Sequence, residues 1–93
     1  MSEYSETINR CSAKSRRGQA LVFVRDQRGL GKPARADTLA MSLQCTMSAA
    51  KSTMKWLRGQ KLVRWLADQD TNEITGDGLQ QIWSWSQPKR RRN

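Results

Sequence analysis

The chain has 93 residues, which is enough for one hydrophobic core and too few for two. Hydrophobic residues make up 37% of it, and no apolar run approaches the roughly 20 residues of a membrane span, so we expect no membrane partner. The first ten residues are polar and do not have the apolar segment of a signal peptide, which favours a cytoplasmic protein.

Histidine is absent from the sequence and cysteine occurs only at positions 11 and 45. A zinc site normally takes four Cys or His ligands, and histidine is the commonest general base in enzymes. The sequence also has no phosphate-binding glycine loop and no paired carboxylates in an apolar setting. We therefore expect no enzyme activity, no metal site and no cofactor. Cys45 is expected in the core, the role of Cys11 is left open, and a disulfide is not expected in a reducing compartment.

The formal net charge of +9 is unevenly distributed along the chain. Residues 10–64 contain thirteen Lys or Arg and two Asp, a net charge of +11. Residues 65–88 contain four acidic residues and no basic one, and the last five residues add four positive charges. A basic balance of this kind is typical of a protein that binds nucleic acid, although an anionic surface or an acidic partner also fits.

The first expected elements are a disordered arm over residues 1–11 and a helix from Ser12 to Arg28. Ala20, Phe23 and Val24 share one face of this helix, and Gly18 weakens its start. Two glycines at positions 29 and 31 end the helix, and a proline at 33 keeps residues 32–35 extended.

Two further helices follow closely. The first runs from Ala36 or Asp37 to Leu43, and the second opens at Thr46, a good N-cap, and closes near Gly59. The inward residues of the second helix are spaced by helical periods at positions 50, 54 and 57.

The remaining chain is expected to form a strand, a turn and a last helix. Alternation over residues 62–67 puts Val63, Trp65 and Ala67 on one face of the strand, and the polar run 68–73 turns the chain back. Thr75 caps a helix over residues 77–85, whose inward side chains are Leu79, Ile82 and Trp83, with Trp85 as a further candidate. An alternative is a strand over 81–86 at the end of a long wing. Residues 87–93 are expected to be a basic disordered tail.

The segment from Thr38 to Trp65 resembles the core of winged helix-turn-helix transcription factors, including MarR-type regulators. The resemblance is carried by the Leu39–Ala40 pair, the cap at Thr46, a leucine at 57 and the Leu62–Val63 pair, and it covers about residues 36–82. Lys61 departs from it, because the family usually has glycine there and Gly59 would have to end the helix instead. The resemblance implies an α+β, mainly α, winged helix-turn-helix domain over residues 12–86, with a three-helix core, a short β-wing and a C-terminal helix.

In such a fold the helix 46–59 enters the major groove of DNA. Small side chains let its backbone approach, and its two lysines reach phosphates or guanine edges. The candidate recognition residues are Met47, Ser48, Ala49, Lys51, Ser52 and Lys55. The candidate contacts to the DNA backbone are Arg16, Arg17, Lys32, Arg35, Arg58, Arg64, Lys89, Arg90, Arg91 and Arg92. The wing is acidic at positions 68 and 70, so Arg64 at its base is the better phosphate contact there.

The sequence therefore predicts a small, nucleoid-associated transcriptional regulator, from a plasmid, a phage or a bacterial chromosome, that binds double-stranded DNA. The candidate surfaces for a homodimer are Trp83, Trp85 and the N-terminal arm, and no small-molecule effector is evident. Two alternatives remain open, which are a protein-interaction adaptor on the same scaffold and an RNA-binding protein that uses the basic tail.

Overall fold

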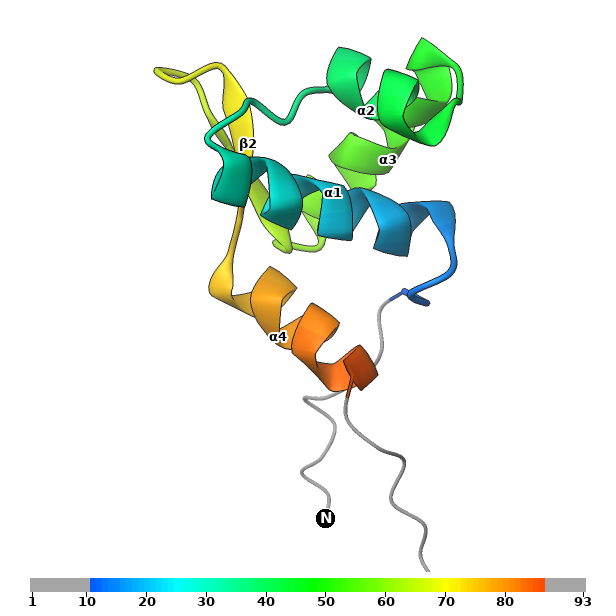
Figure 1. The fold of residues 1–93 in the computed structure, drawn as a ribbon, viewed down its shortest axis with the longest axis vertical. Helices are drawn as coiled ribbons and strands as arrows, with labels where there is room; N and C mark the ends of the chain where they lie inside the picture. The colour runs from blue at the N-terminus through cyan, green and yellow to red at the C-terminus, as the bar shows by residue number, and fades with distance from the viewer. Residues whose placement is uncertain (1–10, 87–93) are drawn as a thin grey trace, which may run out of the picture.

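The computed structural model describes residues 11–86. Within that range the elements in chain order are α1 (Arg16–Leu30), α2 (Ala36–Leu43), α3 (Met47–Gly59), β1 (Val63–Leu66), β2 (Thr71–Ile74) and α4 (Gly76–Ser86). The two strands pair antiparallel, so the described part of the chain has an α+β fold that is mainly helical (Figure 1). The expected arm and tail fall on residues 1–10 and 87–93, which lie outside the described residues.

Helix α1 begins four residues later than the sequence predicted. Residues 12–15 form a turn instead, in which the backbone N–H of Ser15 donates to the Ser12 carbonyl at 3.1 Å. Ser15 is the N-cap, and its Oγ accepts from the Gly18 N–H at 3.1 Å. Gly18 has to be glycine because a Cβ there would collide with the backbone of Ser12. At the other end the helix runs through Gly29 and stops at Gly31, which has φ 70°.

The core is centred on α1, which lies between α2 and α3 on one side and α4 on the other (Figure 1). Leu21 and Val24 of α1 are fully buried, whereas Phe23, which was expected on the buried face, is only partly buried. The remaining residues of the hydrophobic core are Ala20, also of α1, and, from the rest of the chain, Ala34, Leu39, Ala50, Met54, Leu57, Leu62, Val63 and Ile74. Cys45 is partly buried and packs at the edge of this core.

The predicted bounds of α2 and α3 are confirmed. They are joined by a tight turn in which Gln44 has φ 54° and the Cys45 N–H donates to the Ala40 carbonyl at 3.0 Å. Thr46 is the N-cap of α3, as predicted, and its Oγ1 accepts from the Ala49 N–H at 3.0 Å. This cap fixes where α3 starts and therefore which of its side chains face outward.

The cap that ends α3 differs from the expectation, although the helix stops at the predicted residue. Gly59 is the last residue of the helix and does not adopt a left-handed conformation; Lys61 does, with φ 63°. The Leu62 N–H donates to the Leu57 carbonyl and the Lys61 N–H to the Arg58 carbonyl, both at 3.0 Å. Lys61 thus takes the backbone conformation that glycine adopts at the end of many helices, because this pair of hydrogen bonds requires it.

The strands form a short hairpin with the register Val63↔Ile74 to Leu66↔Thr71. Thr75 then caps α4 as predicted: its Oγ1 accepts from the Gly78 N–H at 3.1 Å and donates to the Lys61 carbonyl at 2.7 Å. The chain from 81 to 86 is therefore helix, and the alternative of a strand there is wrong.

The expected inward face of α4 is wrong for two of its residues. Leu79 and Trp83 are 43% and 59% exposed, and the helix instead buries Gly78 and Gln81. The reason is that Gly78 lies so close to the Leu62 carbonyl and the Ile74 side chain that a Cβ there would collide with both. This close approach turns α4 about its axis, so that Ile82 and Trp85 face the core only in part.

The same helix holds the start of the described chain. The indole N–H of Trp85 donates to the Cys11 carbonyl at 3.1 Å, and Cys11 is only 8% exposed. Cys11, which was expected at the end of the arm, is thus packed against the domain.

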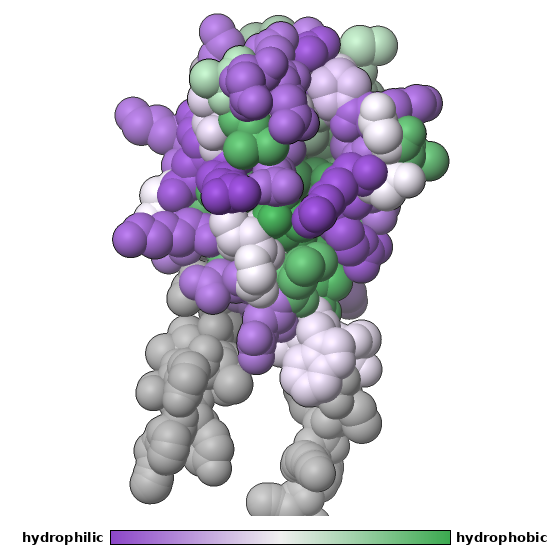
Figure 2. All heavy atoms as spheres, turned by 90° about the vertical axis from the view of Figure 1, so that its left-hand side faces the viewer, coloured by the Kyte–Doolittle hydropathy of each residue, from purple (hydrophilic) through white to green (hydrophobic). Residues whose placement is uncertain are grey.

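No helix within residues 11–86 is both long enough and apolar enough to cross a membrane. The side of the molecule shown in Figure 2 is mostly hydrophilic, with a narrow hydrophobic band.

Candidate nucleic-acid interface

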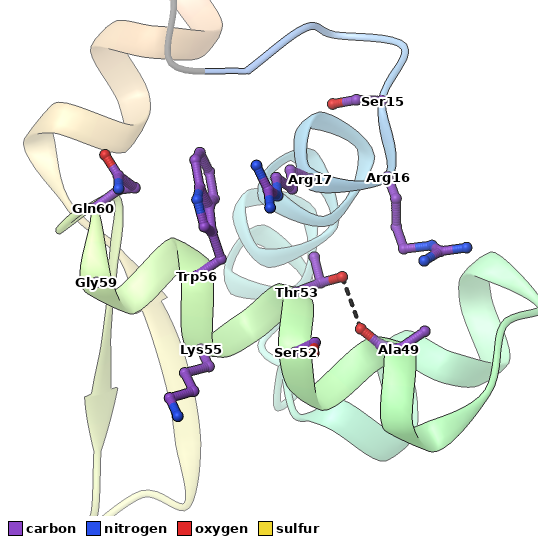
Figure 3. Close-up of a pocket in the computed structure, with 10 residues that line it drawn as sticks. All are labelled: Ser15, Arg16, Arg17, Ala49, Ser52, Thr53, Lys55, Trp56, Gly59 and Gln60. Atoms are coloured by element: carbon purple, nitrogen blue, oxygen red, sulfur yellow. Dashed lines mark hydrogen bonds between the residues drawn. The ribbon is translucent and has the colours of Figure 1, made fainter.

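The exposed face of α3 brings together the six side chains predicted for recognition. Met47, Ser48, Lys51, Ser52 and Lys55 are exposed and line one shallow depression, and Ala49 is partly buried beside them. The opposite side of α3 faces the core through Ala50, Thr53, Met54 and Leu57. The hydroxyl of Thr53 donates to the Ala49 carbonyl at 2.8 Å, so it is satisfied within the helix (Figure 3).

A first groove separates this face from the start of α1, and we call it the α1–α3 groove (Figure 3). It has a volume of about 820 Å³ and is lined by Ser15, Arg16, Arg17, Ala49, Ser52, Thr53, Lys55, Trp56, Gly59 and Gln60. Arg17 covers the indole of Trp56, with its Cζ 4.1 Å from the ring centroid. Two arginines of α1 therefore lie along the edge of the exposed face of α3.

A second groove lies on the other side of α3, next to the strands, and we call it the α3–hairpin groove. Its lining residues are Arg35, Ala36, Lys51, Met54, Lys55, Arg58, Trp65 and Asn72. Asn72 fixes one wall, since its Nδ2 donates to the Ala34 carbonyl at 2.9 Å and its Oδ1 accepts from Arg58 at 3.4 Å. The lysines at 51 and 55 line both this groove and the depression on α3, so the surfaces are continuous.

Cations without carboxylate partners gather on this continuous surface. No Asp or Glu lines the depression on α3 or either flanking groove. In the described part of the chain, no ion pair involves Arg16, Arg17, Lys51, Lys55 or Arg58, whereas Arg25, Arg35 and Arg64 each pair with an acid. Arg35 is the mixed case, because it lines the α3–hairpin groove but contacts Asp37 at 3.4 Å and Asp70 at 3.3 Å. The result is a positive field at α3 that its own domain does not neutralise.

The other predicted backbone contacts lie elsewhere. Lys32 is exposed in the loop after α1 and lines a different depression, together with Arg28 and Glu73. Arg64 forms an ion pair with Glu73 at 2.8 Å, its cross-strand partner, and lines neither groove beside α3. The four basic residues at 89–92 lie outside the described residues.

Two features of this surface were not predicted. Trp65 is 44% exposed and lines the α3–hairpin groove, although alternation along its strand had suggested an inward position beside Val63. Alternation puts both side chains on the same face of the hairpin, but Val63 is buried in the core whereas Trp65 lines the groove beside α3. The contact between Arg17 and Trp56 was also missed, since it joins residues of two different helices.

Comparisons of the chain with protein-family models, with curated proteins and with solved structures find no match. Residues 11–86 contain no group of three or more Cys, Asp or Glu side chains placed to hold a metal ion.

Proposed function

We propose that this protein is a winged helix-turn-helix protein that binds double-stranded DNA, with α3 as the recognition helix and β1–β2 as the wing. The observation that carries the proposal is the exposed face of α3, where two unpaired lysines lie between two grooves that contain further cations and no carboxylate. The order of elements supports it as well, because a helix, a tight turn and a second helix are followed directly by a hairpin.

The side chains on α3 suit a helix that enters the major groove. That groove is about 12 Å wide and admits an α-helix. Ser48, Ala49 and Ser52 are small, so they let the helix backbone come near the base edges. Lys51 and Lys55 are one turn apart on the same face and reach toward phosphates or guanine edges. The N-terminal half of α3 has no Arg, Asn or Gln to make bidentate contacts with bases, so we expect modest sequence specificity.

The flanking arginines are placed to meet the two sugar–phosphate backbones on either side of α3. Arg16 and Arg17 lie on the α1 side, and Arg58 lies on the hairpin side. The tip of the hairpin carries Asp68 and Asp70, so it is unsuited to phosphate contact. DNA binding of this kind is centred on one helix and its two neighbouring grooves.

Salt dependence of binding to a labelled 20-base-pair duplex tests the proposal. Neutralisation of Z phosphates gives a slope of about −0.9Z in a plot of log K against log salt concentration. The five unpaired cations around α3 therefore predict a slope between about −4 and −5. Lys51→Ala and Lys55→Ala should each reduce the magnitude of the slope by about one. Ser52→Glu should weaken binding more, because it places a negative charge against the DNA, and should leave the melting temperature unchanged.

Lys32→Ala is the matched control, since it removes the same charge from a residue that lines none of the three surfaces around α3. Its effect should be small. The proposal is wrong if the protein fails to bind duplex DNA at low salt, or if Lys32→Ala weakens binding as much as Lys55→Ala does.

A role in transcription as a nucleoid-associated homodimer extends the proposal. Of the two tryptophans considered for a dimer surface, Trp83 is exposed on α4, whereas Trp85 is partly buried and bonded to Cys11. Sedimentation equilibrium of the wild type and of Trp83→Ala tests whether the protein forms a dimer through α4. Selection of bound sequences from a random duplex library would show a palindrome if a dimer binds two half-sites.

Exposure of Leu79 and Trp83, one turn apart on α4, favours a second candidate function as a protein-interaction adaptor. In that case Leu79→Ser together with Trp83→Ser should abolish binding to the protein partner, while Lys51→Ala and Lys55→Ala should leave this binding intact. RNA binding through the basic tail is separable by deletion of residues 89–92.

A further inference from the structure

Trp65 presents an exposed indole in the middle of a basic surface. It lies in the α3–hairpin groove with two apolar residues, Ala36 and Met54, and with the cations of Lys51, Lys55 and Arg58. The large apolar surface of this indole remains hydrated, so a planar ring that covers it would gain free energy from its burial. The groove therefore combines a flat apolar surface with unpaired positive charge.

The other three tryptophans do not have this combination. The indole of Trp56 is covered by the guanidinium of Arg17, and the indole N–H of Trp85 is bonded to the Cys11 carbonyl. Trp83 is more exposed than Trp65, but its helix carries no Lys or Arg. Among the described residues, Trp65 is thus the tryptophan that is both exposed and surrounded by cations without carboxylate partners.

The chemistry of the groove specifies a ligand with a planar ring and a nearby anion. Its volume of about 500 Å³ lies within the range of small-ligand sites, roughly 300–1,000 Å³. Proteins that bind single-stranded nucleic acid use this combination, because a base stacks on an aromatic side chain while the backbone lies in a positively charged groove. A base inside a duplex is already stacked on both faces, so the groove requires an unpaired base.

We propose that the α3–hairpin groove binds one unpaired nucleotide, with its base stacked on Trp65 and its phosphate held by Lys51, Lys55 and Arg58. This inference rests on the proposed function only for the class of ligand, a nucleic acid. It adds a preference that a recognition helix alone does not produce: DNA with an unpaired segment next to the duplex binds more tightly than blunt duplex DNA. The same chemistry would also accept a free nucleotide, and the experiment separates the two sources.

The test is a titration of the full-length protein with four probes: labelled dT8, thymidine monophosphate, a blunt 20-base-pair duplex and the same duplex with a dT8 overhang. Anisotropy measures the affinity for DNA, and tryptophan fluorescence reports stacking. We expect dT8 to quench the fluorescence and Trp65→Ala to remove most of this quenching. We also expect Trp65→Ala to weaken dT8 binding by about tenfold, the size of one lost base–indole stack.

Two variants make the result specific to the ring at position 65. Trp83→Ala is the matched control, because it removes a more exposed indole from a helix without cations and should leave dT8 binding unchanged. Trp65→Phe keeps an aromatic face and should retain most of the affinity. Thermal unfolding of all three variants shows whether they remain folded. If Trp65→Ala unfolds, Trp65→Phe supplies the answer through fluorescence: it should bind dT8 but lose most of the quenching, and quenching equal to that of the wild type would overturn the inference.

The inference is overturned if a folded Trp65→Ala binds dT8 as tightly as Trp83→Ala does, or if dT8 fails to quench the fluorescence of the wild type. It is also overturned if Trp65→Ala weakens the blunt duplex as much as dT8, since Trp65 would then contact the backbone. If the protein binds the blunt duplex but not dT8, this inference is rejected and the proposed function is unaffected. If it binds dT8 but not the duplex, only the proposed function is rejected. If dT8 binds more tightly than thymidine monophosphate, the ligand of the groove is a nucleotide within a strand. If the two affinities are equal, the ligand is a free nucleotide.

Discussion

Arg17 lies over the indole ring of Trp56, with its guanidinium carbon 4.1 Å from the ring centroid, and so connects the first turn of α1 to α3 (Figure 3). The neighbouring Arg16 makes no such contact, although both arginines line the α1–α3 groove. Two adjacent residues of equal charge therefore have different physical roles. Both add to the positive field at α3, but only Arg17 also contributes to the packing of the two helices.

This difference predicts separate effects of Arg16→Ala and Arg17→Ala. Arg17→Ala should lower the free energy of unfolding by about 0.5–1 kcal/mol, the usual size of a cation–π contact at an exposed site. Arg16→Ala should leave it unchanged. Each variant should reduce the magnitude of the salt slope of duplex binding by about one. Urea denaturation measures the first quantity and anisotropy the second, and equal stabilities for the two variants would contradict the assigned role of Arg17.

The ion pair between Arg64 and Glu73 predicts that Arg64 contributes little to DNA binding as it stands. The two side chains are 2.8 Å apart across the hairpin, so the carboxylate competes with any phosphate. Arg64→Ala should leave duplex affinity nearly unchanged. Glu73→Gln frees the arginine and should raise the affinity roughly two- to fivefold at low salt. The double variant separates this effect from the loss of a negative charge: if it binds as tightly as Glu73→Gln alone, Arg64 was not the residue released.

The elements around α3 were predictable because their determinants are local. Thr46 caps α3 from a position that the sequence alone identifies, and the helical spacing of Ala50, Met54 and Leu57 fixes the buried side. The outward residues of α3 follow from these two facts. The start of α1 was predicted wrongly because a turn over residues 12–15 takes the place of the first helical turn. The spacing of hydrophobic residues does not indicate this turn.

The features that depend on tertiary contacts were not predictable. The orientation of α4 is determined by the approach of Gly78 to Leu62 and Ile74, and periodicity favours the larger Leu79 and Trp83 instead. The neutralisation of Arg64 depends on strand register, which follows from the length and geometry of the turn between β1 and β2. The grooves beside α3 form only because α1 and the hairpin pack next to this helix, and that packing is a tertiary contact. The sequence thus identified α3 and its exposed face but not the surfaces that flank it.

A substitution at Lys61 should stabilise the folded protein. At this position the sequence departs from its resemblance to winged helix-turn-helix proteins, which usually have glycine there. Its φ of 63° is a left-handed conformation that costs a residue with a side chain about 1 kcal/mol relative to glycine. Lys61→Gly should therefore raise the free energy of unfolding by up to about 1 kcal/mol, less the greater entropy of glycine in the unfolded chain.

Lys61→Ala is the control for this prediction, since it removes the same charge and keeps the Cβ. It should not stabilise the protein, because the backbone strain remains. Chemical denaturation of the two variants and the wild type measures the difference. Equal stability of the glycine and alanine variants would show that the backbone at position 61 is not strained.

Burial raises the pKa of the Cys11 thiol, and the nearby positive charge of Arg17 opposes this shift only in part. The thiol is neutral when protonated, so a raised pKa in the folded state means that folding favours the protonated form. The corresponding stability is fully present below the pKa of the unfolded thiol, about 8.5, and is lost as the pH rises through the higher folded value. The protein should therefore lose stability in the alkaline range in a way that Cys11→Ala abolishes.

Urea denaturation between pH 7 and pH 10 measures this loss, with Cys45→Ala as the background so that position 11 carries the only thiol that differs between the two proteins compared. The difference in unfolding free energy between Cys45→Ala and the double variant Cys11→Ala/Cys45→Ala should shrink as the pH rises and the Cys11 thiol ionises. Lysine and tyrosine titrations are common to both proteins and cancel in this difference.

Alkylation gives an independent measurement. In the native protein Cys45, which is partly exposed, should react with iodoacetamide before Cys11, whereas in denaturant the two should react at similar rates. A Cys11 that reacts as fast as Cys45 in the native protein would mean that the hydrogen bond from Trp85 does not hold residue 11 against α4.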